Sequence, residues 1–121
     1  MRDDGFMGAI EAGHRVVVTL AMDIDAQRFA SVEVGFVSSA DEAEAPVSAS
    51  NEVAPGHREH LTLAPAARGV LEIRVEMESE SDVGTLSMEV AGVPEQVRRI
   101  AGSTVWRYEV VVDDTTERRF S

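Results

Sequence analysis

Cysteine is absent from this chain of 121 residues. That absence excludes disulfides, thiolate metal sites, iron–sulfur clusters and cysteine nucleophiles. Lysine is absent as well, so all 11 basic residues are arginines, which we attribute to a GC-rich genome or a salt-loving host. The 22 acidic residues give a net charge of −11, which repels nucleic acid and anionic membranes and favours a partner with a basic surface.

Long apolar runs are also missing. The longest one, residues 16–22, is far shorter than the roughly 20 residues that a membrane-spanning helix needs. The first five residues include two acids and a glycine and lack the apolar stretch of a secretory signal. We therefore expect a cytoplasmic protein without a membrane partner. The length and the apolar content of 44% are typical of one globular domain.

Alternation with a period of two residues is the strongest pattern present, and it predicts strands with one buried face. The first run places five apolar residues on one face: Val16, Val18, Leu20, Met22 and Ile24. The cleanest run alternates four apolar residues with four charged ones: Leu71, Ile73, Val75 and Met77 against Glu72, Arg74, Glu76 and Glu78. Shorter runs follow the same rule near residues 31–36, 61–63, 86–90 and 105–112.

Glycines and prolines separate these runs, and no segment between them keeps a helical period. The pattern predicts an all-β fold, an antiparallel β-sandwich of six to eight strands, immunoglobulin-like or jelly-roll-like. The long connection 38–57 suits a crossover between two sheets and has room for an edge strand near Val47 or Val53. Residues 94–100 are expected to form one helical turn or a short strand.

The domain organisation expected from the pattern has three parts. Residues 1–13 form an N-terminal arm, in which Phe6, Met7 and Ile10 pack as one helical turn or dock on a partner. The β-sandwich domain covers residues 14–112. Residues 113–121 form a charged C-terminal tail, which we expect to be frayed.

Two groups of residues are candidate metal ligands. His57 and His60 lie three positions apart, and a turn at Pro55-Gly56 would be needed to bring both imidazoles to one ion. The alternative is that they are polar residues of a loop and a strand edge. Four acids form the second group, Asp23, Asp25, Asp41 and Glu42, which would suit Ca²⁺ if the loops carrying them meet at one end of a sandwich. The alternative for these acids is a solvated surface.

Two further pairs are candidates for binding a ligand or partner. Trp106 and Tyr108 share one face of a predicted strand and, if exposed, could stack on a sugar or contact a protein. Their companions Val110 and Val112 favour the core instead. Arg98-Arg99 is the only basic doublet outside the tail, and it could bind a phosphate or carboxylate or form a surface ion pair.

No phosphate loop, dinucleotide fingerprint or nucleophile elbow occurs in the sequence. The leading hypothesis is therefore a non-catalytic binding module, an accessory or regulatory domain that recognises a protein partner and needs no cofactor. Unpaired strand edges make a homodimer a further expectation. One alternative is a Ca²⁺-dependent or carbohydrate-binding sandwich, and a second is a small metal-dependent enzyme that uses histidine and carboxylate side chains.

Overall fold

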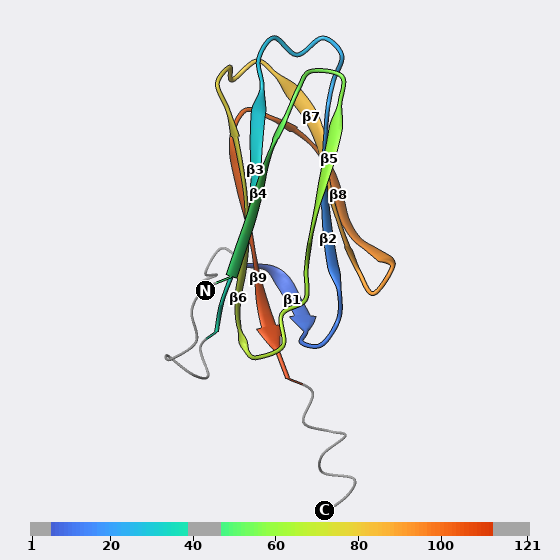
Figure 1. Ribbon diagram of the computed structural model, residues 1–121, viewed down its shortest axis with the longest axis vertical. Coiled ribbons are helices and arrows are strands. Elements are labelled where there is room, and N and C mark those ends of the chain that lie inside the picture. The colour runs from blue at the N-terminus through green and yellow to red at the C-terminus, as the bar shows by residue number, and fades with distance from the viewer. Residues whose placement is uncertain (1–5, 39–46, 113–121) are drawn as a thin grey trace, which may run out of the picture.

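The computed structural model describes residues 6–38 and 47–112, and Figure 1 shows these residues as strands joined by loops. No helix occurs in the described ranges. Their nine strands are β1 (Phe6–Glu11), β2 (Val16–Met22), β3 (Ala30–Ser38), β4 (Val47–Val53), β5 (Arg58–Leu63), β6 (Gly69–Met77), β7 (Val83–Val90), β8 (Val93–Ala101) and β9 (Thr104–Val111). The all-β prediction is confirmed, with more strands than the six to eight expected.

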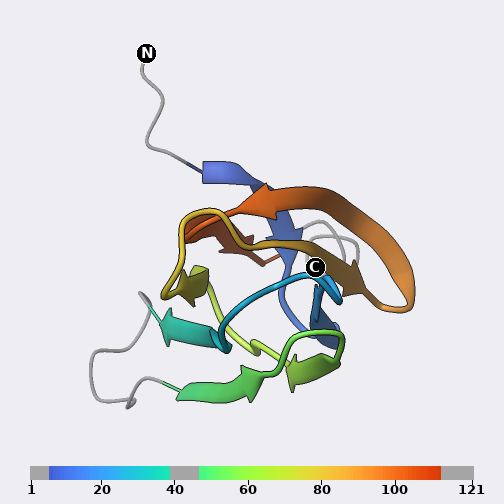
Figure 2. The same cartoon turned by 90° about the horizontal axis from the view of Figure 1, so that it is seen from above.

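The strands form two sheets, which confirms the predicted sandwich. One sheet has five strands in the order β1-β9-β6-β3-β4, and the other has four in the order β5-β2-β7-β8. Neighbouring strands of the described chain are antiparallel except for β1 and β9, which are parallel. Seen from above, β4 and β5 lie side by side where the two sheets meet along one edge (Figure 2).

The core lies between the sheets and follows the alternation in the sequence. Four residues of β2 face inward and are almost fully buried: Val16, Val18, Leu20 and Met22. Four residues of β6 also face inward and are buried: Leu71, Ile73, Val75 and Met77. Each such side chain contributes roughly 1.5–3 kcal/mol relative to an exposed one. The alternation that positions this core also sends the intervening polar residues to the outer faces of the sheets.

Two residues predicted to be in the core lie outside it, and one of them, Val112, follows the end of β9 and is 38% exposed. Ile24 is 84% exposed, because β2 ends at Met22 and the chain turns there. The N–H of Ala26 donates to the carbonyl of Asp23 at 3.1 Å, and the N–H of Gly56 donates to the same carbonyl at 3.0 Å. The strand period therefore stops two residues before the apolar pattern does.

The N-terminal segment differs from its prediction. Phe6, Met7 and Ile10 belong to strand β1 and form no helical turn, and of the three Ile10 is buried, at 5% exposure. β1 is an edge strand, and its register against β9 shifts between Phe6 and Gly8. Ile10 is its one buried residue, so its sequence has no need of the alternation that predicted the other strands. The predicted tail, residues 113–121, lies outside the described residues.

The connection 38–57 contains the edge strand that was expected near Val47 and Val53. This strand, β4, pairs with β3 in the five-stranded sheet. The chain then crosses to the four-stranded sheet through residues 54–57, where Gly56 adopts a positive φ of 77°. Residues 94–100 lie within β8, so the strand alternative is the correct one there.

Candidate functional site

The outer face of the five-stranded sheet carries a group of carboxylates on three adjacent strands. Glu52 of β4 and Glu76 of β6 both lie opposite Ser31 of β3, one on each side. Glu33, two positions along β3, lies opposite Ser50 of β4 and Arg74 of β6. Neighbouring strands are about 4.8 Å apart, so the backbones of Glu52 and Glu76 are about 10 Å apart. We call Glu33, Glu52 and Glu76 the acidic face.

The three carboxylates of the acidic face are exposed. None of them forms an ion pair with another residue in the described part of the chain. They surround open depressions of about 350 and 240 Å³, in which hydroxyl and carboxylate side chains predominate. The acidic face therefore presents three carboxylates without an ion-pair partner among the described residues, and the nearest cation, Arg74, lines the smaller depression but is paired with Glu72.

Glu72, on the same side of β6, is neutralised within the protein. Its carboxylate accepts hydrogen bonds from Arg107 at 2.9 Å and from Arg74 at 3.0 Å. The hydrogen bond from Arg107 is the largest cause that holds the pKa of Glu72 below its usual value, and burial opposes it. The two arginines thus separate the acidic face from the end of the sheet beyond Glu72.

An exposed aromatic ring lies at the other end of the acidic face. Phe29, just before β3, is 55% exposed and lines a depression of about 220 Å³ together with Glu52 and Glu76. Apolar surface beside unpaired charge is a common composition for a protein-binding surface, because the ring gains from burial while the charges orient the partner.

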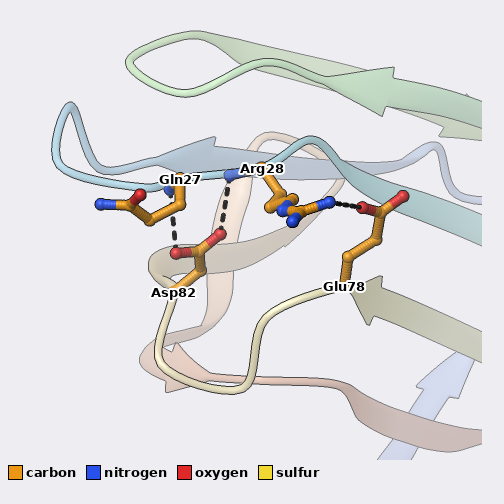
Figure 3. A network of polar contacts seen from close by, with 4 residues as sticks. All are labelled: Gln27, Arg28, Glu78 and Asp82. Atoms are coloured by element: carbon orange, nitrogen blue, oxygen red, sulfur yellow. Dashed lines mark hydrogen bonds and ion pairs between the residues drawn. The ribbon is translucent and has the colours of Figure 1, made fainter.

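Asp82 holds the segment that carries Phe29. Its side chain is buried, at 3% exposure, and points toward the β2–β3 loop (Figure 3). Oδ1 accepts the backbone N–H of Gln27 at 2.9 Å, and Oδ2 accepts that of Arg28 at 3.0 Å. The Arg28 guanidinium in turn donates to Glu78 at 3.3 Å. Asp82 was not predicted, because nothing in the surrounding Ser-Glu-Ser-Asp segment distinguishes a buried acid from one in a solvated turn.

The outer face of the four-stranded sheet has a different character. Its two central strands present mostly small neutral side chains, Val17, Thr19 and Ala21 from β2 and Thr85 and Ser87 from β7, with Glu89 of β7 as their one exposed acid. Negative charge on the two outer sheet faces is therefore asymmetric and concentrated on the five-stranded sheet.

The predicted Ca²⁺ ligands are not brought together by the residues that can be described. Asp23 accepts two hydrogen bonds from Arg99, at 2.6 and 2.9 Å, and these hold the pKa of Asp23 below its usual value. Asp25 is exposed at the tip of the β2–β3 loop. Asp41 and Glu42 lie outside the described residues.

The histidines lie on different parts of the surface. His57 is in the loop before β5, where its carbonyl accepts the N–H of Met22 at 2.9 Å. His60 projects from the outer face of β5 opposite Thr19, and His14 precedes β2 at the other end of the sandwich. Across residues 6–38 and 47–112, no three histidine or acidic side chains are close enough to hold a metal ion.

Trp106 and Tyr108 belong to the core, at 4% and 1% exposure, so neither ring is available to a ligand at the surface. The Tyr108 hydroxyl is buried and has no hydrogen-bond partner among the described residues. Burial is the main cause that raises the pKa of Tyr108, and Glu95 of β8 raises it further while Arg98 lowers it. Arg98 itself is exposed, whereas Arg99 is bound to Asp23.

Comparisons with protein-family models, with curated proteins and with solved structures found no match to this chain. In the described part of the chain there is no helix long and apolar enough to cross a membrane.

Proposed function

We propose that this chain is a non-catalytic interaction module that binds a protein partner with a basic surface through the acidic face. The observation that carries the proposal is the set of three exposed carboxylates on adjacent strands, unpaired within the described residues, beside exposed Phe29. Arginine or lysine side chains of a partner would form the ion pairs that these carboxylates lack among the described residues.

Electrostatics favours this face over the rest of the sheet. Glu72 has two internal arginine partners, so an external cation gains little there. Glu33, Glu52 and Glu76 have none among the described residues, and their charges add to the field of an acidic protein. Such a field accelerates encounter with a basic partner and weakens with salt, since charges are screened over about 8 Å at physiological ionic strength.

The shape of the site supports a protein partner rather than a small molecule. Pockets for small ligands are usually concave and mostly apolar, with a few polar groups. The depressions beside the acidic face are open and lined mainly by serine, asparagine and glutamate. The residues named for the two alternatives give them less support: Arg99 occupies Asp23, Trp106 and Tyr108 are buried, and no three histidine or acidic side chains of the described residues are close enough to hold a metal ion.

The test compares two triple variants that change net charge equally. The first replaces the acidic face, Glu33→Gln, Glu52→Gln and Glu76→Gln. The matched control replaces exposed acids elsewhere, Glu11→Gln, Asp25→Asn and Glu89→Gln. Affinity for a labelled nona-arginine peptide should fall at least about tenfold for the first variant, and by much less for the control, because only the first removes the unpaired cluster. Equal losses would contradict the proposal.

Capture from a host lysate extends the test to the natural partner. Wild-type protein and the control variant should retain a common protein that the acidic-face variant loses. Retention of the same proteins by all three baits, or of none by any of them, would overturn the proposal.

A further inference from the structure

Strand β8 ends the four-stranded sheet with a free edge. It pairs with β7 on one side, and no other described strand pairs with it on the other. Seven of its nine residues are exposed, and two of these are the large apolar residues Val93 and Val97. A free edge of this kind is a template for another strand.

The remaining edges are less suited to pairing. β4 and β5 lie against one another and close one side of the sandwich (Figure 2). β1 is shorter, with six residues, and its register shifts between Phe6 and Gly8. Among the described strands, β8 is thus the longest edge that no other described strand covers.

Charge distinguishes β8 from the other eight described strands. With Arg98, Arg99 and Glu95, it is the only one with a net positive charge. Two copies of a chain with a net charge of −11 repel one another overall, so the approach that costs least is through their most positive element.

The sequence of β8 is complementary to itself in the antiparallel direction. A two-fold axis at Val97 places Val97 opposite its counterpart. The flanking pairs are Gln96 with Arg98 and Glu95 with Arg99, and beyond Glu95 the register shift of β8 breaks the alternation. Opposite residues of an antiparallel pair are the ones that interact, and opposite charges there are favourable. Both copies therefore contribute the same acid–base pair.

We propose that two copies of this chain pair antiparallel through β8 about an axis at Val97, joining their four-stranded sheets into one eight-stranded sheet. This interface is separate from the acidic face and does not depend on the proposed function.

Arg99 and Glu95 can both form this charged pair. Arg99 is held by Asp23 and by Thr85, at 3.2 Å, yet its side chain stays 60% exposed and a guanidinium has five N–H donors. Glu95 lies in the irregular part of β8, where the register against β7 shifts. Glu95 lies opposite Arg99 of the second copy. The neighbouring residue of that copy, Arg98, projects to the other face of the sheet, so a basic side chain is close to Glu95 on whichever face its carboxylate lies.

The same irregularity fixes the register. Pro94 lacks an N–H, and the register shift beside it interrupts the regular ladder, so pairing is confined to the segment around Val97. Sliding the second copy by two residues would bring arginines opposite arginines or place Pro94 in the middle of the new ladder, and both are unfavourable.

A single engineered cysteine tests the axis directly, because the chain has none of its own. Directly opposite Cα atoms in an antiparallel pair are about 4.5–5.5 Å apart, within the range for a disulfide. Val97→Cys should cross-link to a covalent dimer under mild oxidation. Val105→Cys is the matched control, since Val105 is similarly exposed, at 46%, but lies on the five-stranded sheet.

A charge swap provides the second test, read as the dimer fraction in sedimentation over a dilution series. Glu95→Arg and Arg99→Glu should each weaken the dimer at least about tenfold, and the double swap should restore it. The Glu33/Glu52/Glu76 variant should dimerise like wild type. Monomer at every concentration, cross-linking of Val97→Cys no faster than of Val105→Cys, or pairing of β8 with an added acidic peptide instead of a second copy would overturn the inference.

Discussion

The carboxylate of Asp82 accepts the backbone N–H of Gln27 at 2.9 Å, across 55 positions of sequence. With its second oxygen on the N–H of Arg28, it joins the β2–β3 loop to the β6–β7 loop. Asp82 is buried and both hydrogen bonds are partly buried, so removing its side chain leaves two backbone donors without their acceptor. One acid thereby keeps Phe29 at the end of the acidic face.

Asp82→Ala should lower the free energy of unfolding by about 2–4 kcal/mol, since each unsatisfied donor costs about 1–3 kcal/mol. Asp82→Asn keeps one acceptor and should lose less. The measurement is urea unfolding. Glu78→Gln is the control, because it breaks only the exposed Arg28–Glu78 pair and should change stability by less than about 1 kcal/mol. A smaller effect for Asp82→Ala than for the control would refute this role.

Tyr108→Phe should leave the protein equally or more stable, by up to about 1 kcal/mol, because it removes a buried hydroxyl that lacks a described partner. It should also change alkaline behaviour. Burial raises the pKa of Tyr108 on folding, so the folded state disfavours the ionised phenol, and stability is unaffected below the unfolded pKa of about 10 but falls as the pH rises above that value. Thermal unfolding between pH 8 and about 11 should show a shallower alkaline decline for the variant. A clear loss of stability at neutral pH would reveal a partner for the hydroxyl.

Gly69→Ala should destabilise the protein by more than about 2 kcal/mol through overpacking. A Cβ there would lie 2.2 Å from the carbonyl oxygen of Val37 and 2.8 Å from the ring of Phe36, so backbone must move. Gly8→Ala is the contrast, because its Cβ would meet the nearest described atom, in the Tyr108 ring, at an ordinary 3.8 Å. Similar melting temperatures for the two variants would contradict the close approach of Gly69 in β6 to Val37 in β3.

The free energy of unfolding should decrease at acidic pH because of Glu72. Its pKa is lowered on folding, so its contribution is present above the unfolded pKa and is lost as the pH falls through the folded value. Arg107→Gln should raise the Glu72 pKa more than Arg74→Gln does, since Arg107 makes the dominant hydrogen bond. Carboxyl-carbon NMR titration measures both. The reverse order would contradict the geometry.

Much of the fold follows from the sequence, because alternation reports burial directly. Residues 71–78 indicate both a buried strand face and a charged outer face, and the structure has both in β6. β1 could not be predicted in this way, since it lies at an edge where only Ile10 is well covered. Ile24 was wrongly predicted to be buried, because the apolar alternation of the sequence continues past Met22, where β2 ends.

The candidate site depended on information that no local pattern contains. Glu33, Glu52 and Glu76 are adjacent only because β3 lies between β4 and β6 in one particular register, and a shift of one residue would send each side chain to the other face. Asp82 required knowledge of which two loops meet. The charge balance did predict the kind of partner that we propose, but not the surface that would receive it.

The most direct measurement of the central proposal is an amide NMR titration of the protein with the nona-arginine peptide near physiological ionic strength. The proposal predicts chemical-shift changes concentrated on β3, β4 and β6 around Ser31, with smaller changes on the outer face of β2 and β7, where Glu89 is the one exposed acid. Changes spread evenly over the molecule, or centred on the four-stranded sheet, would contradict a binding role for the acidic face.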